Sequence, residues 1–336
     1  MKIAIHHTRG SFSDRWIQYC EENNIDYKLV NAYDSDIVQQ VADCDAFMWH
    51  HHHENYKDVL FAKQLLYSLQ IAGKKVFPDF NTGWHFDDKV GQKYLLEAIG
   101  APLVPSYVFY TKEDAFQWID SVDFPKVFKL RGGAGASNVM LAHNRAEARR
   151  LVKKAFSRGF AQFNKWGYFK EKWRKWRSGQ VNFIEVIKGF GHLFINSTFS
   201  KMHAPEKGYV YFQDFIIDNT TDFRVKVVNG NCWAFQRLVR ENDFRASGSG
   251  VLIFDNNHIP LSLIKIAQSV AKQLRIQSLA FDFVIDKNTN NPLIVEISYC
   301  FGFDEKELKN GYWDSNLVFH KEKFNPFYWM IDDLIK

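Results

Sequence analysis

The chain has 336 residues, of which 46% are hydrophobic, 16% aromatic and 24% charged, and its formal net charge is +5. These values are typical of a globular protein of two or three domains. No run of eighteen apolar residues occurs, so the sequence predicts no membrane-spanning helix. The start of the chain resembles a strand and not a signal peptide. Four scattered cysteines without metal-binding spacing favour a reduced, cytoplasmic location: Cys20, Cys44, Cys232 and Cys300.

Residues 1–85 alternate strand-like and helix-like patterns, which predicts a parallel sheet with helices on its faces. We expect this segment to form an N-terminal α/β domain with right-handed crossovers. The expected strands are Lys2–His7, Tyr27–Ala32, Ala46–His50 and Lys75–Pro78, with helices at Ser13–Asn23 and Asn55–Ile71.

Residues 86–217 are expected to form a second domain that begins with a linker helix, Asp87–Ile99, closed by Gly100. Strand and helix patterns then alternate around a glycine-rich turn, Gly132–Ser137. The expected elements are strands Ser106–Tyr110, Lys126–Arg131, Asn138–Ala142, Asn182–Lys188 and Gly208–Ile217, and helix Glu113–Val122.

The basic excess of the chain lies in residues 145–180, which contain twelve Lys or Arg and two Glu. Aromatic residues recur there at helical spacing, which predicts two amphipathic helices with a break near Gly167. We expect the aromatic stripes to be packed core, and the positive faces are candidates for an anionic partner. Nucleic acid is the less favoured partner. The two stripes are Phe156, Phe160 and Phe163, and Phe169, Trp173 and Trp176.

Residues 218–336 are expected to form a C-terminal domain with strands Asp222–Asn229 and Cys232–Arg240 and helix Leu261–Leu274. A hairpin from Ser278 to Ser298 follows. The aromatic tail resembles a loop at first and is expected to pack on the sheet or to cover the active site.

The hairpin contains two carboxylates, Asp282 and Glu296, in otherwise apolar strands. With a turn at Lys287–Asn291, the register pairs Asp286 with Pro292, Ile285 with Leu293, and finally Asp282 with Glu296. Like charges that face each other are destabilising, and a divalent cation is the simplest compensation. A solvated strand face is the alternative.

Two further segments are candidates for binding a nucleotide. Backbone N–H groups of a glycine-rich turn can approach phosphate oxygens closely, and a lysine on the preceding strand can reach the same phosphates. An apolar strand that ends in polar groups can bind an adenine edge, and a following aspartate can bind ribose hydroxyls. The candidates are Lys129, Gly132, Gly133, Gly135 and Ser137 for phosphate, and Gln213, Asp214, Phe215, Ile216 and Asp218 for the nucleoside.

The order of these pieces resembles the ATP-grasp superfamily of carboxylate–amine ligases, which includes D-alanine–D-alanine ligase, glutathione synthetase and ribosomal-protein glutamate ligase. The resemblance covers roughly residues 75–303. It implies an ATP-grasp fold with an N-terminal α/β domain and a basic helical extension in the lid. The matching segments are Asp88-Lys89, Lys129, Gln213-Asp214-Phe215-Ile216, Arg224, Asp243-Phe244-Arg245, and the pair Asp282 and Glu296.

The resemblance implies that ATP phosphorylates a carboxylate and that an amine displaces phosphate from the acyl phosphate. Two Mg²⁺ ions would bind Asp282, Glu296 and the triphosphate, and Lys89 and Lys129 would hold phosphates. Arg224 and Arg245 would stabilise the transferring group.

One position departs from the family's pattern. The family has Glu-x-Asn at the end of the second metal strand, whereas this chain has Glu296-Ile297-Ser298. A nucleotide-binding protein without ligase activity is therefore an alternative, and a kinase that phosphorylates a hydroxyl is another.

The substrate side is expected at the carboxyl ends of the N-terminal strands. We expect a small metabolite or a surface-polysaccharide precursor as the acceptor. Surface loops are the alternative for the histidines, packing is the alternative for the tail residues, and an ion-pair role is the alternative for the arginines. A zinc site formed by the histidines is a minor alternative. The candidates are His6, His7, His50, His51, His85, Arg237, Arg240, Trp313 and Asp314.

Overall fold

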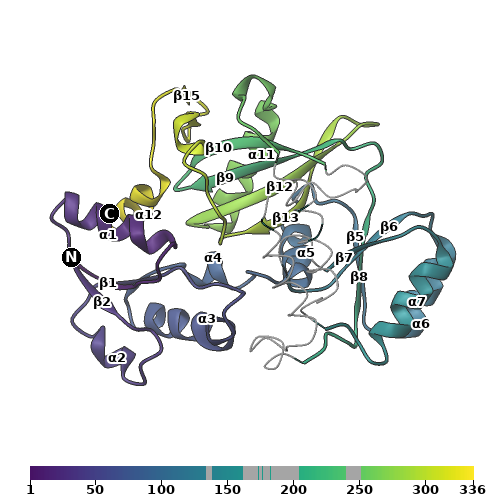
Figure 1. Cartoon of the computed structure of the whole chain (residues 1–336), viewed down its shortest axis with the longest axis horizontal. Coiled ribbons are helices and arrows are strands. Elements are labelled where there is room, and N and C mark those ends of the chain that lie inside the picture. The colour runs from purple at the N-terminus through teal and green to yellow at the C-terminus, as the bar shows by residue number, and fades with distance from the viewer. Residues whose placement is uncertain (134–137, 162–172, 174–175, 177–181, 183–203, 240–250) are drawn as a thin grey trace. The chain divides into compact units, whose positions relative to one another are not determined.

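A computed structural model describes residues 1–133, 138–161, 173, 176, 182, 204–239 and 251–336 (Figure 1). The chain divides into two compact units. Unit 1 contains residues 1–86, 94–103 and 217–336, and unit 2 contains residues 87–93 and 104–216. The predicted N-terminal and C-terminal domains thus fall into unit 1, and the three-domain division stays a prediction.

The N-terminal part of unit 1 contains a parallel sheet of four strands in the order β2-β1-β3-β4. Its helices cover both faces, as the sequence predicts. Ile3, Ile5 and Met48 pack toward α1, whereas Ala4 and Phe47 pack toward α3. The elements are β1 (Lys2–His6), α1 (Phe12–Glu22), β2 (Asp26–Val30), α2 (Ile37–Gln40), β3 (Ala46–Trp49), α3 (Tyr56–Ile71), β4 (Lys75–Phe77) and α4 (Phe80–Gly83).

The C-terminal part of unit 1 contains a larger sheet in the order β13-β12-β9-β10-β14-β15, with β11 paired to β10. The pairings in this sheet are antiparallel. Helix α11 (Leu261–Leu274) covers one face through Leu263, Ile264 and Ala267. The other elements are β9 (Thr221–Val228), β10 (Asn231–Leu238), β11 (Leu252–Ile253), η1 (Asn256–His258), β12 (Ser278–Asp286), β13 (Asn291–Ser298), η2 (Glu307–Lys309), β14 (Tyr312–Trp313) and β15 (Phe319–His320).

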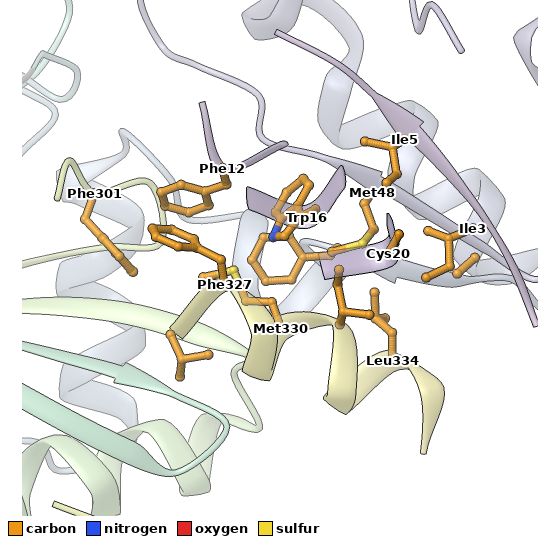
Figure 2. Close-up of a cluster of buried hydrophobic side chains, with 14 of the residues drawn as sticks. Ile3, Ile5, Phe12, Trp16, Cys20, Met48, Phe301, Phe327, Met330 and Leu334 are labelled. Atoms are coloured by element: carbon orange, nitrogen blue, oxygen red, sulfur yellow. The ribbon is translucent and has the colours of Figure 1, made fainter. Parts of the chain in front are cut away.

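The chain ends in a helix, α12 (Pro326–Ile335), that the sequence analysis did not predict. Asn325 caps it by accepting from the backbone N–H of Phe327, and Pro326 lies at the favoured first position. Figure 2 shows Phe327, Met330 and Leu334 of α12 facing Trp16 of α1. The tail therefore packs against the N-terminal sheet as well as the larger one.

Unit 2 contains an antiparallel sheet in the order β5-β8-β6-β7, with α6 and α7 packed on it. Helix α5 (Lys89–Ala98) begins in unit 2 and ends in unit 1, where Leu96 is buried in the core. The elements are β5 (Ser106–Phe109), α6 (Lys112–Ser121), β6 (Lys126–Lys129), β7 (Val139–Ala142), α7 (Arg145–Ala155) and β8 (Val210–Asp214).

Two predictions in unit 2 need correction. Phe156 and Phe160 do not share a helix, because α7 ends at Ala155 and Phe160 pairs with Glu206, and Phe163 lies outside the described residues. Gly159 has φ +72°, which breaks the helical path. The predicted strand Gly208–Ile217 ends at Asp214. The second basic helix and the strand Asn182–Lys188 fall largely outside the described residues.

Candidate active site

Strand β9 carries charged residues on one face and apolar residues on the other. Phe223, Val225 and Val227 pack against α11. Because successive side chains of a strand point to opposite faces, Asp222, Arg224 and Lys226 lie together on the face away from that helix. This alternation positions the candidate site.

Asp282 and Glu296 lie on that same face. They are paired directly across β12 and β13, as the sequence predicts. The two pairs nearer the turn differ from the prediction, since Asp286 pairs with Asn291 and Ile285 with Pro292.

A bulge at Val295 explains why the pairs near the turn are shifted by one residue while Asp282 still pairs with Glu296. Phe283 pairs with Ile294 and Asp282 with Glu296, so Val295 has no opposite residue on β12. Ile294 and Ile297 are both buried in the core beside α11, although residues three apart would face opposite sides of a regular strand. The bulge therefore places Glu296 on the face of Asp282.

Asp282 is held by two arginines. Arg224 donates from Nε to Oδ1 at 2.7 Å and from Nη2 to Oδ2 at 2.8 Å. Nη2 of Arg237 lies 3.0 Å from Oδ2. Arg237 also donates to both oxygens of Asp222, at 2.6 and 2.7 Å. These two aspartates and two arginines neutralise one another.

The arginines change how the acidic pair is interpreted. Burial alone would raise the pKa of Asp282, but Arg224 and Arg237 outweigh it and hold that pKa well below its usual range. The guanidiniums thus supply compensation that the sequence analysis assigned to a cation. Glu296 adds a further negative charge to this face, so an affinity for cations stays compatible with the geometry.

Lys226 forms a separate buried ion pair next to this network. It is fully buried, and its ammonium contacts the Glu307 carboxylate and donates to the carbonyl of Gly302 at 2.8 Å. Trp233 also donates to Glu307, at 2.8 Å. Burial lowers the pKa of Lys226 to about 8 despite the carboxylate. This pair fixes the loop that follows β13.

Ser298, a predicted metal ligand, and the residues after it are tightly held. Its hydroxyl donates to the carbonyl of Cys300 at 2.9 Å. The buried Tyr299 hydroxyl donates to the carbonyl of His51 at 2.6 Å. His50 Nε2 lies 3.1 Å from Cys300 Sγ. The histidine segment after β3 therefore contacts the end of the candidate metal strand.

His50 has a defined tautomer in this arrangement. Its ring stacks on Phe12 with 3.6 Å between centroids, and its Nδ1 accepts from the Phe12 N–H at 3.3 Å. A neutral ring then carries its proton on Nε2, facing Cys300. Burial lowers the pKa of His50 to about 3, which keeps the ring neutral at physiological pH.

The other histidine candidates differ in exposure. His6, His51 and His85 are buried, at 6%, 2% and 0% exposure, and His7 is exposed. The Nδ1 atom of His6 accepts from the N–H of Ala32 at 2.9 Å. Burial lowers the pKa of His85 to about 3 and that of His51 well below the usual value. The burial of His6, His51 and His85 argues against the alternative that they lie in surface loops.

The candidate phosphate-binding residues of unit 2 are interconnected. Lys89 Nζ donates to the carbonyl of Gly133 at 2.8 Å, and Asp87 accepts from the Gly133 N–H at 2.7 Å. A side chain at Gly132 would lie 3.1 Å from the Asp87 carboxylate. Asp87 thus clamps the start of the glycine turn, a role that the sequence analysis missed. Gly135 and Ser137 lie outside the described residues.

Lys129 is buried and contacts a residue predicted for the nucleoside. Its Nζ donates to Gln213 Oε1 at 2.6 Å, and Gln213 Nε2 donates to the Ser106 hydroxyl at 3.1 Å. Asp214 accepts from Lys126 at 2.6 Å. The structure therefore brings the side chains of Lys129 and Gln213 into contact between the neighbouring strands β6 and β8. Phe215, Ile216 and Asp218 follow the strand, and Asp218 has φ +59°.

The remaining candidates have structural contacts or are not described. Trp313 is buried in the core beside α11. Asp314 accepts from the backbone N–H groups of Asn316 and Val318, both at 2.9 Å, and lies 3.1 Å from His320. Both environments favour packing. Arg240 and Arg245 lie outside the described residues.

Among the residues that the structure describes, no group of three or more His, Cys, Asp or Glu side chains is arranged to hold a metal ion. The zinc alternative therefore gains no support. Two carboxylates on one face fit Mg²⁺ better, because Mg²⁺ is commonly bound by one or two carboxylates and completes its shell with phosphate oxygens and water.

The chain has the ATP-grasp fold, as its sequence predicts. It is similar over 100% of its length to 99% of an ATP-grasp RimK-domain protein from Sphaerobacter thermophilus, with 15% identity and a TM-score of 0.57. D-alanine–D-alanine ligase from Bacillus anthracis, solved with ATP, matches with 13% identity and a TM-score of 0.56, covering 92% of this chain and 89% of that one.

A third similar structure is the biotin carboxylase domain of 2-oxoglutarate carboxylase from Hydrogenobacter thermophilus, solved with MgADP and bicarbonate. Its identity is 13% and its TM-score 0.60, covering 99% of this chain and 69% of that one. No protein-family model matches the sequence, and no curated protein matches it significantly. Within the described residues, no helix is both long and apolar enough to cross a membrane.

Proposed function

We propose that this protein is an ATP- and Mg²⁺-dependent ligase that joins a carboxylate to an amine through an acyl phosphate. The single observation that carries the proposal is the facing pair of Asp282 and Glu296 beside Arg224, on one sheet face of an ATP-grasp fold. Similar structures were solved with ATP and with MgADP, which supports these ligands.

In the first step, a substrate carboxylate oxygen attacks the γ-phosphorus of ATP, the bond to the bridging oxygen breaks, and ADP leaves. In the second step, the amine attacks the acyl carbon, inorganic phosphate leaves with the electron pair of the C–O bond, and the amine loses a proton. Mg²⁺, when bound, would neutralise charge on the phosphates.

The residues of this chain would contribute charge and position. Asp282 and Glu296, with Ser298, are proposed to hold Mg²⁺. Lys89 and Lys129 are proposed to bind phosphates, and Arg224 to stabilise the transferring phosphoryl group. Gln213, with Asp214, Phe215, Ile216 and Asp218, is proposed to bind the nucleoside.

The acceptor is proposed to be a small metabolite or a surface-polysaccharide precursor, and the basic segment 145–180 a site for an anionic partner. Helix α7 supports the second idea, since Arg150 and Lys153 of this helix are exposed. A cytoplasmic location suits an enzyme that uses ATP.

A nucleotide-binding protein without ligase activity is the second candidate. One observation favours it: the Ser298 side chain is shorter than the asparagine of the family pattern, and its hydroxyl is anchored at the carbonyl of Cys300. The shorter reach of this anchored side chain would weaken the hold on one Mg²⁺ ion.

Incubation of the protein with Mg²⁺, ATP and pooled carboxylates and amines discriminates these functions. Release of ADP and phosphate together with a new amide, detected by mass spectrometry, is the expected result. A stable phosphoester without amide would indicate a kinase. Tight ATP binding without turnover across the pool would indicate the non-catalytic protein.

A further inference from the structure

We propose that Arg224 and a divalent cation compete for the carboxylate of Asp282, so the site holds the cation tightly only when a phosphate group engages Arg224. This inference rests on the proposed function, because it concerns the Mg²⁺ and nucleotide of the same site. In this proposal, Arg224 couples the binding of the divalent cation to the binding of the nucleotide phosphate.

The first step of the argument is the hydrogen-bond capacity of Asp282. An ionised carboxylate offers about four lone-pair positions. Two of them receive N–H groups of Arg224, one on each oxygen, and Nη2 of Arg237 forms an ion pair with Oδ2 at 3.0 Å. Two fixed positive charges within about 3 Å of these oxygens also repel a dication. Asp282 is therefore a poor cation ligand while both arginines hold it.

The second step identifies which arginine can leave. Arg237 is 7% exposed and is shared between Asp222 and Asp282, so its removal would leave two buried carboxylates without compensation. Arg224 is 25% exposed, and within the described residues its guanidinium hydrogen-bonds to Asp282 alone. Arg224 is the partner that can exchange.

The third step is the chemistry of the exchange. A guanidinium binds a phosphate through the same pair of parallel N–H···O bonds that it makes with a carboxylate. When a phosphate binds Arg224 in place of Asp282, the carboxylate regains the two lone pairs that Arg224 occupied. Cation and phosphate then favour each other, and linkage requires the effect to be equal in both directions.

The test measures binding of Mn²⁺ alone, by electron paramagnetic resonance, to the wild type and to R224Q. We expect R224Q to bind Mn²⁺ about tenfold more tightly than the wild type, within the range typical of coupled sites. R224K keeps the positive charge but loses the paired N–H donors of the planar guanidinium, and we expect its Mn²⁺ affinity to lie between those of the wild type and R224Q. R149Q is the matched control, because Arg149 makes a similar two-bond pair with Asp120 at an exposed position.

A second measurement is the ratio of AMPPNP affinities with and without Mn²⁺, which should be smaller for R224Q than for the wild type. Equal Mn²⁺ affinity of wild type and R224Q, with equal ratios, would overturn the competition. Amide formation by that same wild type would leave the proposed function standing. If the wild type binds AMPPNP but binds no Mn²⁺ even in its presence, the proposed metal site and this inference are both wrong.

Discussion

Asp282 lies opposite Glu296 across β12 and β13, although the pairs between them and the turn are shifted by one residue. Residues that face each other in an antiparallel pair have Cβ atoms about 4.5–5.5 Å apart. One cation could therefore contact both carboxylates. The two side chains differ in environment, because Arg224 and Arg237 hold Asp282.

Replacing Glu296 by Gln should abolish Mg²⁺-dependent ADP release and leave the fold intact. The substitution keeps the shape of the side chain and removes a negative charge from the proposed metal site. Phosphate release and the thermal melting temperature measure the two effects. The control is D286N, a carboxylate at the turn of the same hairpin that accepts from Asn288. Wild-type turnover in E296Q would remove the metal assignment.

Replacing Asp282 by Asn should also stop turnover but at a cost in stability. Removing one partner of a buried ion pair typically costs about 3–5 kcal/mol, because the remaining charge is left uncompensated. Arg224 would be left in that state, whereas Arg237 would keep its pair with Asp222. Urea denaturation measures the change, and an Asp282→Asn variant as stable as E296Q would contradict the network described for β9, β10 and β12.

Replacing Lys129 by Met should weaken AMPPNP binding by about tenfold, equivalent to 1.4 kcal/mol. The buried ammonium contacts Gln213 and is the proposed phosphate ligand of its strand. Isothermal titration calorimetry measures the affinity. K112M is the control, since Lys112 is a half-buried lysine over the ring of Phe116, outside the proposed site. Equal losses in both variants would point to a general effect of charge.

Replacing Lys226 by Met should lower the free energy of unfolding by about 3–5 kcal/mol, because Glu307 would remain buried without its partner. Equilibrium unfolding in urea provides the measurement. Lys2, which pairs with Asp43 at the surface, is the control, and K2M should have little effect. Similar losses in the two variants would argue against a special role for burial.

Unfolding stability should rise from pH 5 to pH 7. The pKa of His85 is about 3 in the folded protein and near 6.5 when exposed, so the unfolded chain binds more protons between these values. Each such histidine adds about 1.4 kcal/mol per pH unit within that window, and its contribution is complete above pH 6.5. H85L should reduce the slope measured by urea denaturation by the contribution of one histidine, because His50 and His51 remain, whereas H258N, at an exposed position, should preserve it.

Much of the fold could be predicted because local signals agreed with it. The periodicity of residues 1–85 predicted the parallel sheet, and helix Leu261–Leu274 was predicted with the bounds observed. Helix α12 was missed because its aromatic residues Phe327, Tyr328 and Trp329 resembled a packed loop, and its apolar face is explained only by distant partners such as Trp16.

The candidate site was less predictable, because its contacts join residues far apart in sequence. The pairing of Asp282 with Glu296 was correct, but a regular hairpin could not reveal the extra residue at Val295. The capture of Asp282 by Arg224 depends on the alignment of β9 with β12. The alternation of Asp222, Arg224 and Lys226 in an apolar strand was the signal that could have indicated it.

The bulge at Val295 also affects how this protein should be aligned with others. A relative without the extra residue would have one residue fewer between the turn and the position that corresponds in space to Glu296. A gapless alignment would then match Glu296 to a residue on the opposite face of the strand, the face that packs against α11. Comparisons of this hairpin should therefore be anchored separately on either side of residue 295.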